Sequence, residues 1–410
     1  MNTRPAIEPP SWELFRYLIR ERSKPAWTSA GDWALDVLER TLGSGWPEEA
    51  WRLRTRLQQT PPIPAELGGS FGYPMHFAEL LEFALRLERL RENIGLDQVI
   101  SELRGDKRHQ RWMHSRQQLE LGTLLAATGV NPSFETPLPG GHQGQGSADV
   151  TFTVDGVAQV VSSYVLYPTD VFRSASASSD RVFEQLTRLH LDAAVNVEAR
   201  ITSDLAEEDE TCFIATVEAA IKAVAADGYA RHLETDFAVV DLSAAASVSA
   251  ADFNITAAMP KEDLWPRVAR RLEKKAQALR CDAPVWVRAD LLDGLWQLTP
   301  WAMASLEERL IAIEEALALN FSESDVAGFV LSSGALLAPG TVDTAEVRTG
   351  SGAVAMRYPI RPLRGREILL VPFRNDEALN VFVAAYRGES AWLNDALASV
   401  HLPSLDDLFG

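Results

Sequence analysis

Residues 118–166 read QLELGTLLAATGVNPSFETPLPGGHQGQGSADVTFTVDGVAQVVSSYVL, and this stretch contains the clearest succession of secondary-structure signals in the chain. Its beginning completes a helix that we expect over Trp112–Ala127, ending at Thr128-Gly129, a natural C-cap. Short β-rich runs follow at Pro132–Thr136, Ala148–Val154 and Ala158–Leu166. Asp155-Gly156 joins the last two runs, and Asp-Gly in this setting is a strong hairpin signal. The local order is therefore helix, strand, hairpin.

The remainder of the chain is long enough for further domains. A chain of 410 residues is too long for one simple core. A strong helix is expected at His76–Glu92, and a helix at Asp263–Arg280 precedes an apolar strand at Pro284–Ala289. We therefore expect an α/β protein made of a helical N-terminal region (1–110), a core (111–290) with an inserted α/β segment at about 170–262, and an α+β C-terminal region (291–410).

Composition limits the compartment and the partners. Two cysteines, Cys212 and Cys281, cannot build a disulfide framework or a zinc cluster alone. No apolar run approaches the roughly 20 residues that span a bilayer, and the N-terminal MNTRPAIEPPSWELF lacks the apolar region of a secretory signal. We therefore expect a cytoplasmic protein with no membrane contact.

The net charge of −18 is unevenly distributed. Residues 1–120 carry equal numbers of basic and acidic side chains, so the whole excess of acid lies in the rest of the chain. Nucleic-acid binders usually carry a basic footprint, because phosphate contacts release counterions. Any contact of this chain with DNA or RNA must therefore be local or supplied by a partner protein.

The helix, the hairpin and their acidic residues resemble the PD-(D/E)xK nuclease superfamily, to which restriction endonucleases belong. In that family a helix carrying a Glu precedes a strand, a hairpin bearing an Asp, and a strand bearing E-x-K. The resemblance covers Trp112–Asp290 and implies a restriction-endonuclease-like mixed sheet flanked by helices. It also implies that Glu120 matches the helix Glu and Asp149 the motif Asp, and that both are catalytic and hold Mg²⁺ if the protein is active.

The tripeptide departs from the family pattern. Ser162 stands where the family has Glu, and Tyr164 where it has Lys. Mg²⁺ prefers oxygen ligands from carboxylates, and the metal and a nearby cation activate water and stabilise charge on the phosphate. A neutral hydroxyl is a weak metal ligand and a tyrosine supplies no permanent cation. The motif is degenerate, so we expect absent or feeble cleavage. We expect Mg²⁺ as the cofactor if the protein is active and no cofactor if it is not.

A helix further along offers a replacement cation. RRLEKKAQAL followed by PVWVRAD resembles the K-x-x-Q helix and strand of some bacterial members of the superfamily. Lys274 and Gln277 are spaced i, i+3 and project from one helix face. In some members the catalytic Lys migrates to a neighbouring helix, so the resemblance makes Lys274, with Gln277, the catalytic candidate here.

The densest basic stretch is Arg104–Arg116, with two histidines interleaved. The basic side chains of such a segment could bind the phosphates of a nucleic acid while a tryptophan stacks on a base. Its candidate contacts are Arg104, Lys107, Arg108, Arg111, Trp112 and Arg116. The alternative interpretation of this segment is a solvated connection between helices. For Glu120 the alternative is a solvated helix position, and for Asp149 it is a turn-stabilising position.

Three functions remain open from the sequence. The first is a nucleic-acid-linked protein of bacterial type, in defence or DNA processing, that binds rather than cuts. The second is a metal-dependent nuclease that uses Glu120, Asp149 and a migrated Lys274. The third is an acidic scaffold that meets a protein partner with a basic surface. A basic strip converging on Glu120 and Asp149 would favour nucleic acid, whereas an acidic face would favour the scaffold.

Overall fold

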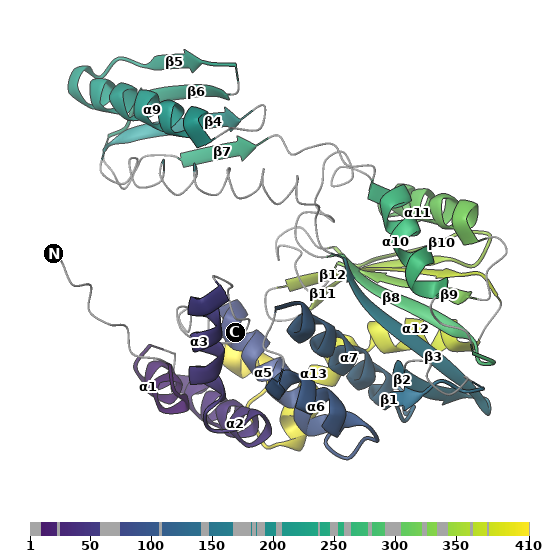
Figure 1. The fold of residues 1–410 in the computed structure, drawn as a ribbon. Helices are drawn as coiled ribbons and strands as arrows, with labels where there is room; N and C mark the ends of the chain where they lie inside the picture. Colours follow the sequence, from purple (N-terminus) through teal and green to yellow (C-terminus); the bar gives the residue numbers. More distant parts are fainter. Residues whose placement is uncertain are drawn as a thin grey trace. The chain divides into compact units, whose positions relative to one another are not determined.

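A computed structural model gives the fold (Figure 1). It describes residues 10–22, 25–57, 74–105, 109–140, 147–166, 182, 186, 193–201, 207–236, 238–246, 253–257, 264–277, 281–291, 305–321, 326–333, 343–360, 364–374 and 377–409. The chain divides into two compact units. Unit 1 comprises Met1–Leu166, Leu264–Leu292 and Ala304–Gly410, and unit 2 comprises Tyr167–Asp263 and Asp293–Met303.

Unit 1 is built on a mixed eight-stranded sheet in the order β1-β2-β3-β8-β9-β12-β11-β10. Its strands are β1 (Ser133–Pro137), β2 (Ser147–Val154), β3 (Val157–Leu166), β8 (Val285–Leu291), β9 (Val326–Ser332), β10 (Ala345–Arg348), β11 (Val354–Ile360) and β12 (Arg364–Pro372). The pairs β3–β8 and β8–β9 are parallel and all others are antiparallel. The three strand runs expected within residues 118–166 and the strand expected at Pro284–Ala289 all lie in this one mixed sheet.

The β2–β3 hairpin closes on the Asp155-Gly156 turn that the sequence predicts. Val154 pairs with Val157 across it. Asp155 and Gly156 have φ angles of 49° and 81°. Two consecutive residues at positive φ form a type I′ turn, whose twist matches that of the flanking strands. The turn therefore fixes the register that aligns β2 with β3.

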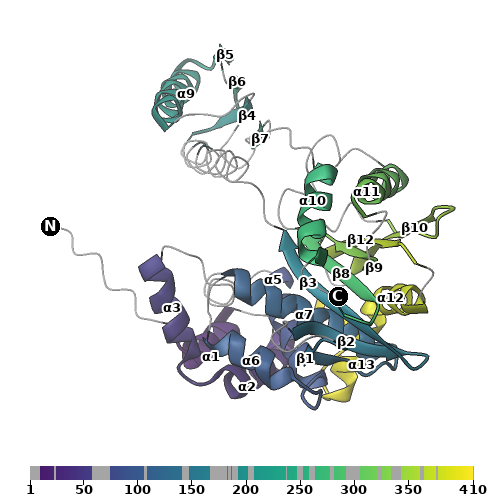
Figure 2. The same cartoon turned by 45° about the vertical axis from the view of Figure 1, so that its right-hand side comes forward.

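Helices cover both faces of the sheet (Figures 1 and 2). On one face lie α7 (His109–Ala127), which packs on β2 and β3, α12 (Glu377–Arg387) and α13 (Glu389–Ser399). On the other lie α10 (Leu264–Gln277), against β8, and α11 (Leu306–Phe321), against β10 and β11. The central strands are accordingly buried: every residue of β9 is buried. This is the pattern of a central strand whose sheet is covered on both faces.

The N-terminal helices share a core with the C-terminal end of the chain. They are α1 (Trp12–Arg22), α2 (Pro25–Leu42), α3 (Trp46–Leu57), α5 (Pro74–Arg89) and α6 (Leu96–Gly105). Trp27 of α2 stacks on Phe77 of α5 at 4.6 Å between ring centroids. Its indole nitrogen donates to the Leu408 carbonyl oxygen of α14 (Leu405–Phe409) at 2.5 Å. Residues far apart in sequence therefore bury one another.

The structure places the unit boundaries elsewhere than at 110/111 and 290/291. The strands after residue 290 continue the sheet beyond β8, so the expected boundary at 290/291 falls inside one sheet. The helices before residue 110 belong to the same unit as α7. Unit 2 contains Tyr167–Asp263, and the expected inserted segment is about 170–262.

Unit 2 is a smaller sheet with a helix packed against it. Its strand order is β5-β6-β4-β7, formed by β4 (Val195–Ile201), β5 (Arg231–Glu234), β6 (Ala238–Ala244) and β7 (Phe253–Ala257). Helix α9 (Glu207–Asp227) buries Phe213 and Val217 against Val197 and Val240. Residues 181–194, whose sequence also predicts a helix, lie almost entirely outside the described residues. Among the described helices of the whole chain, none is long and apolar enough to cross a membrane.

Candidate metal centre

Asp149 lies on β2 beside the strand position where the family resemblance requires a Glu. Its Oδ2 accepts a hydrogen bond from the Ser162 hydroxyl at 3.1 Å and one from the Ser163 N–H at 2.5 Å. The hairpin register, in which Val150 pairs with Val161, sets these positions opposite each other. The motif position is therefore adjacent to Asp149, but a neutral hydroxyl occupies it.

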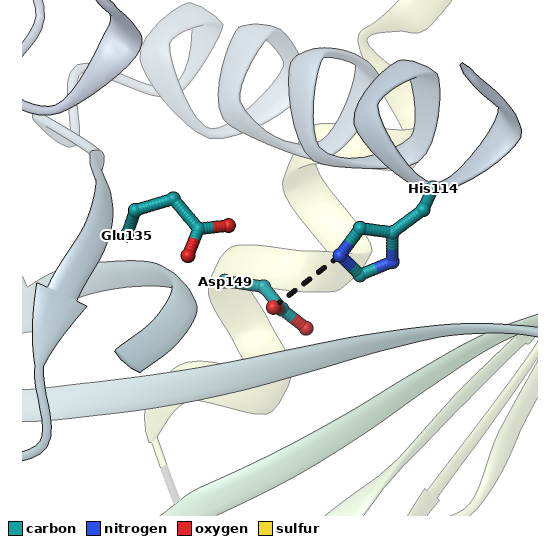
Figure 3. Close-up of side chains that lie close together, drawn as sticks. All are labelled: His114, Glu135 and Asp149. Atoms are coloured by element: carbon teal, nitrogen blue, oxygen red, sulfur yellow. Dashed lines mark ion pairs between the residues drawn. The ribbon is translucent and has the colours of Figure 1, made fainter. Parts of the chain in front are cut away.

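A histidine and a second carboxylate complete the surroundings of Asp149 (Figure 3). One ligand atom from each of His114, Glu135 and Asp149 lies within 4.8 Å of the others. His114 Nε2 is 3.5 Å from Asp149 Oδ1, and 17% and 11% of these two side chains are exposed. The three come from α7, β1 and β2, so the fold brings together residues that are dispersed in the sequence. Partial exposure leaves the group accessible to small ions.

Glu135 is held in place by neutral donors and by an unusual backbone. Its φ is 47°, a region that non-glycine residues seldom adopt. The Gln118 amide donates to Oε1 and the Ser147 hydroxyl to Oε2, each at 2.5 Å. Such a conformation costs of the order of 1 kcal/mol and persists where the surroundings impose it. It aims the carboxylate at the group containing Asp149.

Glu120 belongs to a different cluster from Asp149. Its carboxylate accepts hydrogen bonds from Arg366 at 2.9 and 3.0 Å and also pairs with Arg288. His114 precedes Glu120 by six residues, or about 9 Å along the helix axis, so the two point to different surroundings. In the structure Asp149 shares its donor cluster with His114 and Glu135, whereas the Glu120 carboxylate is engaged by arginines.

The ion pairs around Glu120 extend into a buried network. Arg366 also pairs with Glu389 at 2.9 Å, and Glu389 is 3.3 Å from Arg86. The network joins α5, α7, α13, β8 and β12 through Glu82, Arg86, Glu120, Arg288, Asp290, Arg366 and Glu389. Buried charges are tolerated when they are paired and hydrogen-bonded in this way. The network ties both ends of unit 1 to its central strands.

The pKa values of two carboxyl groups in the network are shifted in opposite directions. Burial would raise the pKa of Glu120, but Arg366 and Arg288 outweigh it and lower the pKa from 4.5 to about 2. For Asp290 burial dominates, and the pKa is raised although Arg288 opposes the shift. At neutral pH Glu120 is therefore an anion that balances the buried arginines.

Lys274 and Gln277 lie on α10, the helix packed against β8. The helix and its place on the sheet are as expected. Both side chains lie outside the described part of the chain, so their roles stay predictions.

The basic segment is only partly described. Arg104 is exposed and its Nε donates to the Thr41 carbonyl at 2.6 Å. Arg116 approaches Glu79 at 3.8 Å. Lys107 and Arg108, with the side chains of Arg111 and Trp112, lie outside the described residues.

Sequence reasoning singled out neither His114 nor Glu135 as a ligand. His114 was visible only as a histidine within the basic segment, and Glu135 as one polar residue of a short strand. No protein-family model matches the chain, and no curated protein matches it significantly.

Proposed function

We propose that this protein is nucleic-acid-linked and that its restriction-endonuclease-like core binds rather than cleaves. One observation carries the proposal: Asp149 lies against Ser162, the position where the family has its Glu. The order α7, β1, β2, β3, α10, β8 also agrees with the order that the resemblance implies. The architecture supports a nuclease-like origin, while the hydroxyl at position 162 argues against efficient hydrolysis.

The compartment and the biological role belong to the same proposal. Cys212 and Cys281 are free thiols, which suits a reducing cytoplasm. A component of bacterial defence or DNA processing is the role that fits a degenerate nuclease core. DNA or RNA is the proposed partner, bound through the Arg104–Arg116 segment.

Fluorescence anisotropy with labelled duplex DNA and single-stranded RNA tests the proposal. We expect binding at low salt and little cleavage of plasmid or single-stranded DNA in Mg²⁺ or Mn²⁺. The segment contains at most five cations, and each phosphate contact contributes a slope of about −0.9 to the log–log salt dependence. The slope should therefore be no steeper than about −4 to −5.

Charge-matched variants locate the binding site. Replacing Arg108 and Arg111 by Ala should weaken binding to all sequences similarly, because phosphate contacts position a protein without reading bases. The control removes two cations from unit 2, Lys222 and Arg231, whose charges already pair with Glu218 and Asp227. Equal losses in both double variants would show that the segment is not the site.

A metal-dependent nuclease is the second candidate, favoured by the donors around Asp149. Robust cleavage that Asp149→Asn abolishes would make it the leading function. If the protein binds no nucleic acid even at low salt, the acidic interaction scaffold would lead instead.

A further inference from the structure

The atoms of the His114–Glu135–Asp149 cluster are spaced like the ligands of one ion. Two donors that each lie about 2.1 Å from a tetrahedral ion are about 3.4 Å apart. His114 Nε2 and Asp149 Oδ1 are 3.5 Å apart, and a carboxylate oxygen of Glu135 completes a set within 4.8 Å. Binding of one ion by all three requires any pair wider than about 3.4 Å to close by side-chain rotation.

The side-chain amide of Gln118 lies beside the cluster, and its oxygen has no hydrogen-bond donor. Gln118 is fully buried, and its Oε1 accepts no hydrogen bond. Its Nε2 is 2.5 Å from Glu135 Oε1 and 3.4 Å from His114 Nε2, so the amide group borders the other donors. Buried acceptors are nearly always satisfied in folded proteins. Rotation of the amide by 180° would exchange this oxygen with Nε2 beside Glu135 and His114, at the cost of the Gln118–Glu135 hydrogen bond, so the oxygen could be a further ligand only when an ion is bound.

Charge also favours a cation here. The Gln118 amide and the Ser147 hydroxyl, which hold Glu135, are both neutral. Carboxylate oxygens of Glu135 and Asp149 lie within 4.8 Å of each other. Two negative charges at this separation repel each other, and the repulsion is stronger away from bulk water. A divalent ion between Glu135 and Asp149 would relieve it.

We infer that His114, Glu135 and Asp149 form a binding site for a first-row divalent transition ion such as Zn²⁺, Co²⁺ or Mn²⁺, in preference to Mg²⁺. Imidazole nitrogen suits these ions, whereas Mg²⁺ selects oxygen ligands and retains its water. The expected pairing of Glu120 with Asp149 on Mg²⁺ is thereby replaced by a nitrogen-containing set. The inference does not require nucleic-acid binding.

Cobalt provides a direct readout, because its visible absorption reports nitrogen ligation. The full-length protein, freed of metal, is titrated with Co²⁺, the bound Co²⁺ is displaced with Zn²⁺, and Mg²⁺ is titrated separately by calorimetry. We expect one Co²⁺ site that Zn²⁺ displaces and that Mg²⁺ fills more weakly. His114→Ala and Glu135→Gln should each weaken Co²⁺ binding by about 10- to 100-fold or more, since even loss of a ligand's outer partner costs about that much.

A second His–carboxylate pair supplies the matched control. His232 Nδ1 lies 2.7 Å from Asp241 Oδ1 in unit 2, and both are exposed. His232→Ala should leave the Co²⁺ spectrum and affinity unchanged. Glu135→Gln keeps the side-chain shape, so it preserves a usable test if His114→Ala fails to fold.

The contrary results are equally clear. Unchanged Co²⁺ affinity in both cluster variants, or Mg²⁺ binding as tight as Co²⁺ binding, would overturn the inference and leave His114 as a simple ion-pair partner of Asp149. Because these titrations contain no nucleic acid, their failure is separable from failure of the anisotropy experiment.

Discussion

At the scale of single residues, Glu120 lies where arginines from β8 and β12 meet α7. Both arginines are fully buried, and the Glu120 carboxylate pairs with each of them. Its type and its place on the helix are those that the family resemblance implies. Its environment is set by Arg288 and Arg366, one of which lies more than two hundred residues away in the sequence, so sequence patterns around Glu120 could not reveal it.

Replacing Glu120 by Gln should destabilise unit 1 by about 3 to 5 kcal/mol, because it leaves two buried guanidinium groups without their shared counter-charge. Urea unfolding followed by circular dichroism measures the loss. Glu88→Gln is the control, since Glu88 pairs with the exposed Arg40 and Arg91. A surface pair of this kind contributes about 0 to 1 kcal/mol. Similar losses in the two variants would contradict a structural role for Glu120.

The same residue predicts an acid-sensitive stability. The folded-state pKa of Glu120 is about 2 and its ordinary value is 4.5. Its contribution, about 3 kcal/mol, is therefore complete above about pH 4.5 and is lost as the pH falls towards 2. The wild type and Glu120→Gln should differ most near neutral pH and converge below about pH 2 to 3. A difference that stays constant over this range would show that charge is not the cause.

The raised pKa of Asp290 should give stability a pH dependence opposite in sign to that from Glu120. Because burial raises its folded-state pKa above 3.8, stability is lost as the pH rises from that value through the folded-state pKa. Asp290→Asn removes this effect, so its stability relative to the wild type should increase with pH over the same range. Urea midpoints at several pH values distinguish it from Glu120→Gln.

At the scale of elements, local signals predicted the β2–β3 hairpin, since a two-residue turn needs only its own residues. The same holds for α5, whose apolar pattern is long. The sequence predicts no strand at β5, β7 or β10, which span four or five residues each. β5 and β10 alternate between half-buried and exposed residues. β7 pairs with β4, more than fifty residues earlier, so its own residues carry little signal. β5 and β10 pair with the strands that follow them directly, but an alternation over four residues is too short to identify a strand.

The hairpin turn should not tolerate a side chain at Gly156. Its φ is 81° and a Cβ there would meet no atom within 4 Å, so any effect of Gly156→Ala comes from the backbone alone. We expect a loss of about 1 to 2 kcal/mol in thermal or urea unfolding. Gly350→Ala is matched, because that site is equally open and lacks a positive φ. It should change stability by no more than about 0.5 kcal/mol.

At the scale of the whole molecule, one core runs from the N-terminal helices to the C-terminal end. Buried residues of α2, α5, α7, β12, α12, α13 and α14 belong to a single hydrophobic cluster. The sequence predicted separate N-terminal and C-terminal regions because composition and periodicity are read along the chain. Contacts such as Trp27 with Leu408 close a loop of nearly the whole protein, which no local pattern encodes.

This shared core makes a prediction about the last helix. Leu408 is 1% exposed on α14 and belongs to the shared core, so Leu408→Ala should cost about 2 to 5 kcal/mol by leaving a cavity there. Leu319, which is 86% exposed on α11, gives a matched Leu→Ala control that should stay within about 0.5 kcal/mol. Hydrogen–deuterium exchange then shows which helices and strands open more readily in the Leu408→Ala variant.

Exchange should accelerate in both α2 and β12 of Leu408→Ala, although β12 contains neither Leu408 nor Trp27, because one cooperative core opens as a unit. Proteins whose helical and sheet regions are separate domains open each region independently. Faster exchange in α2 alone, with β12 unchanged, would mean that the N-terminal helices and α14 unfold as a domain of their own. The division near residue 110 would then describe the energetics of the chain even though the core is continuous in space.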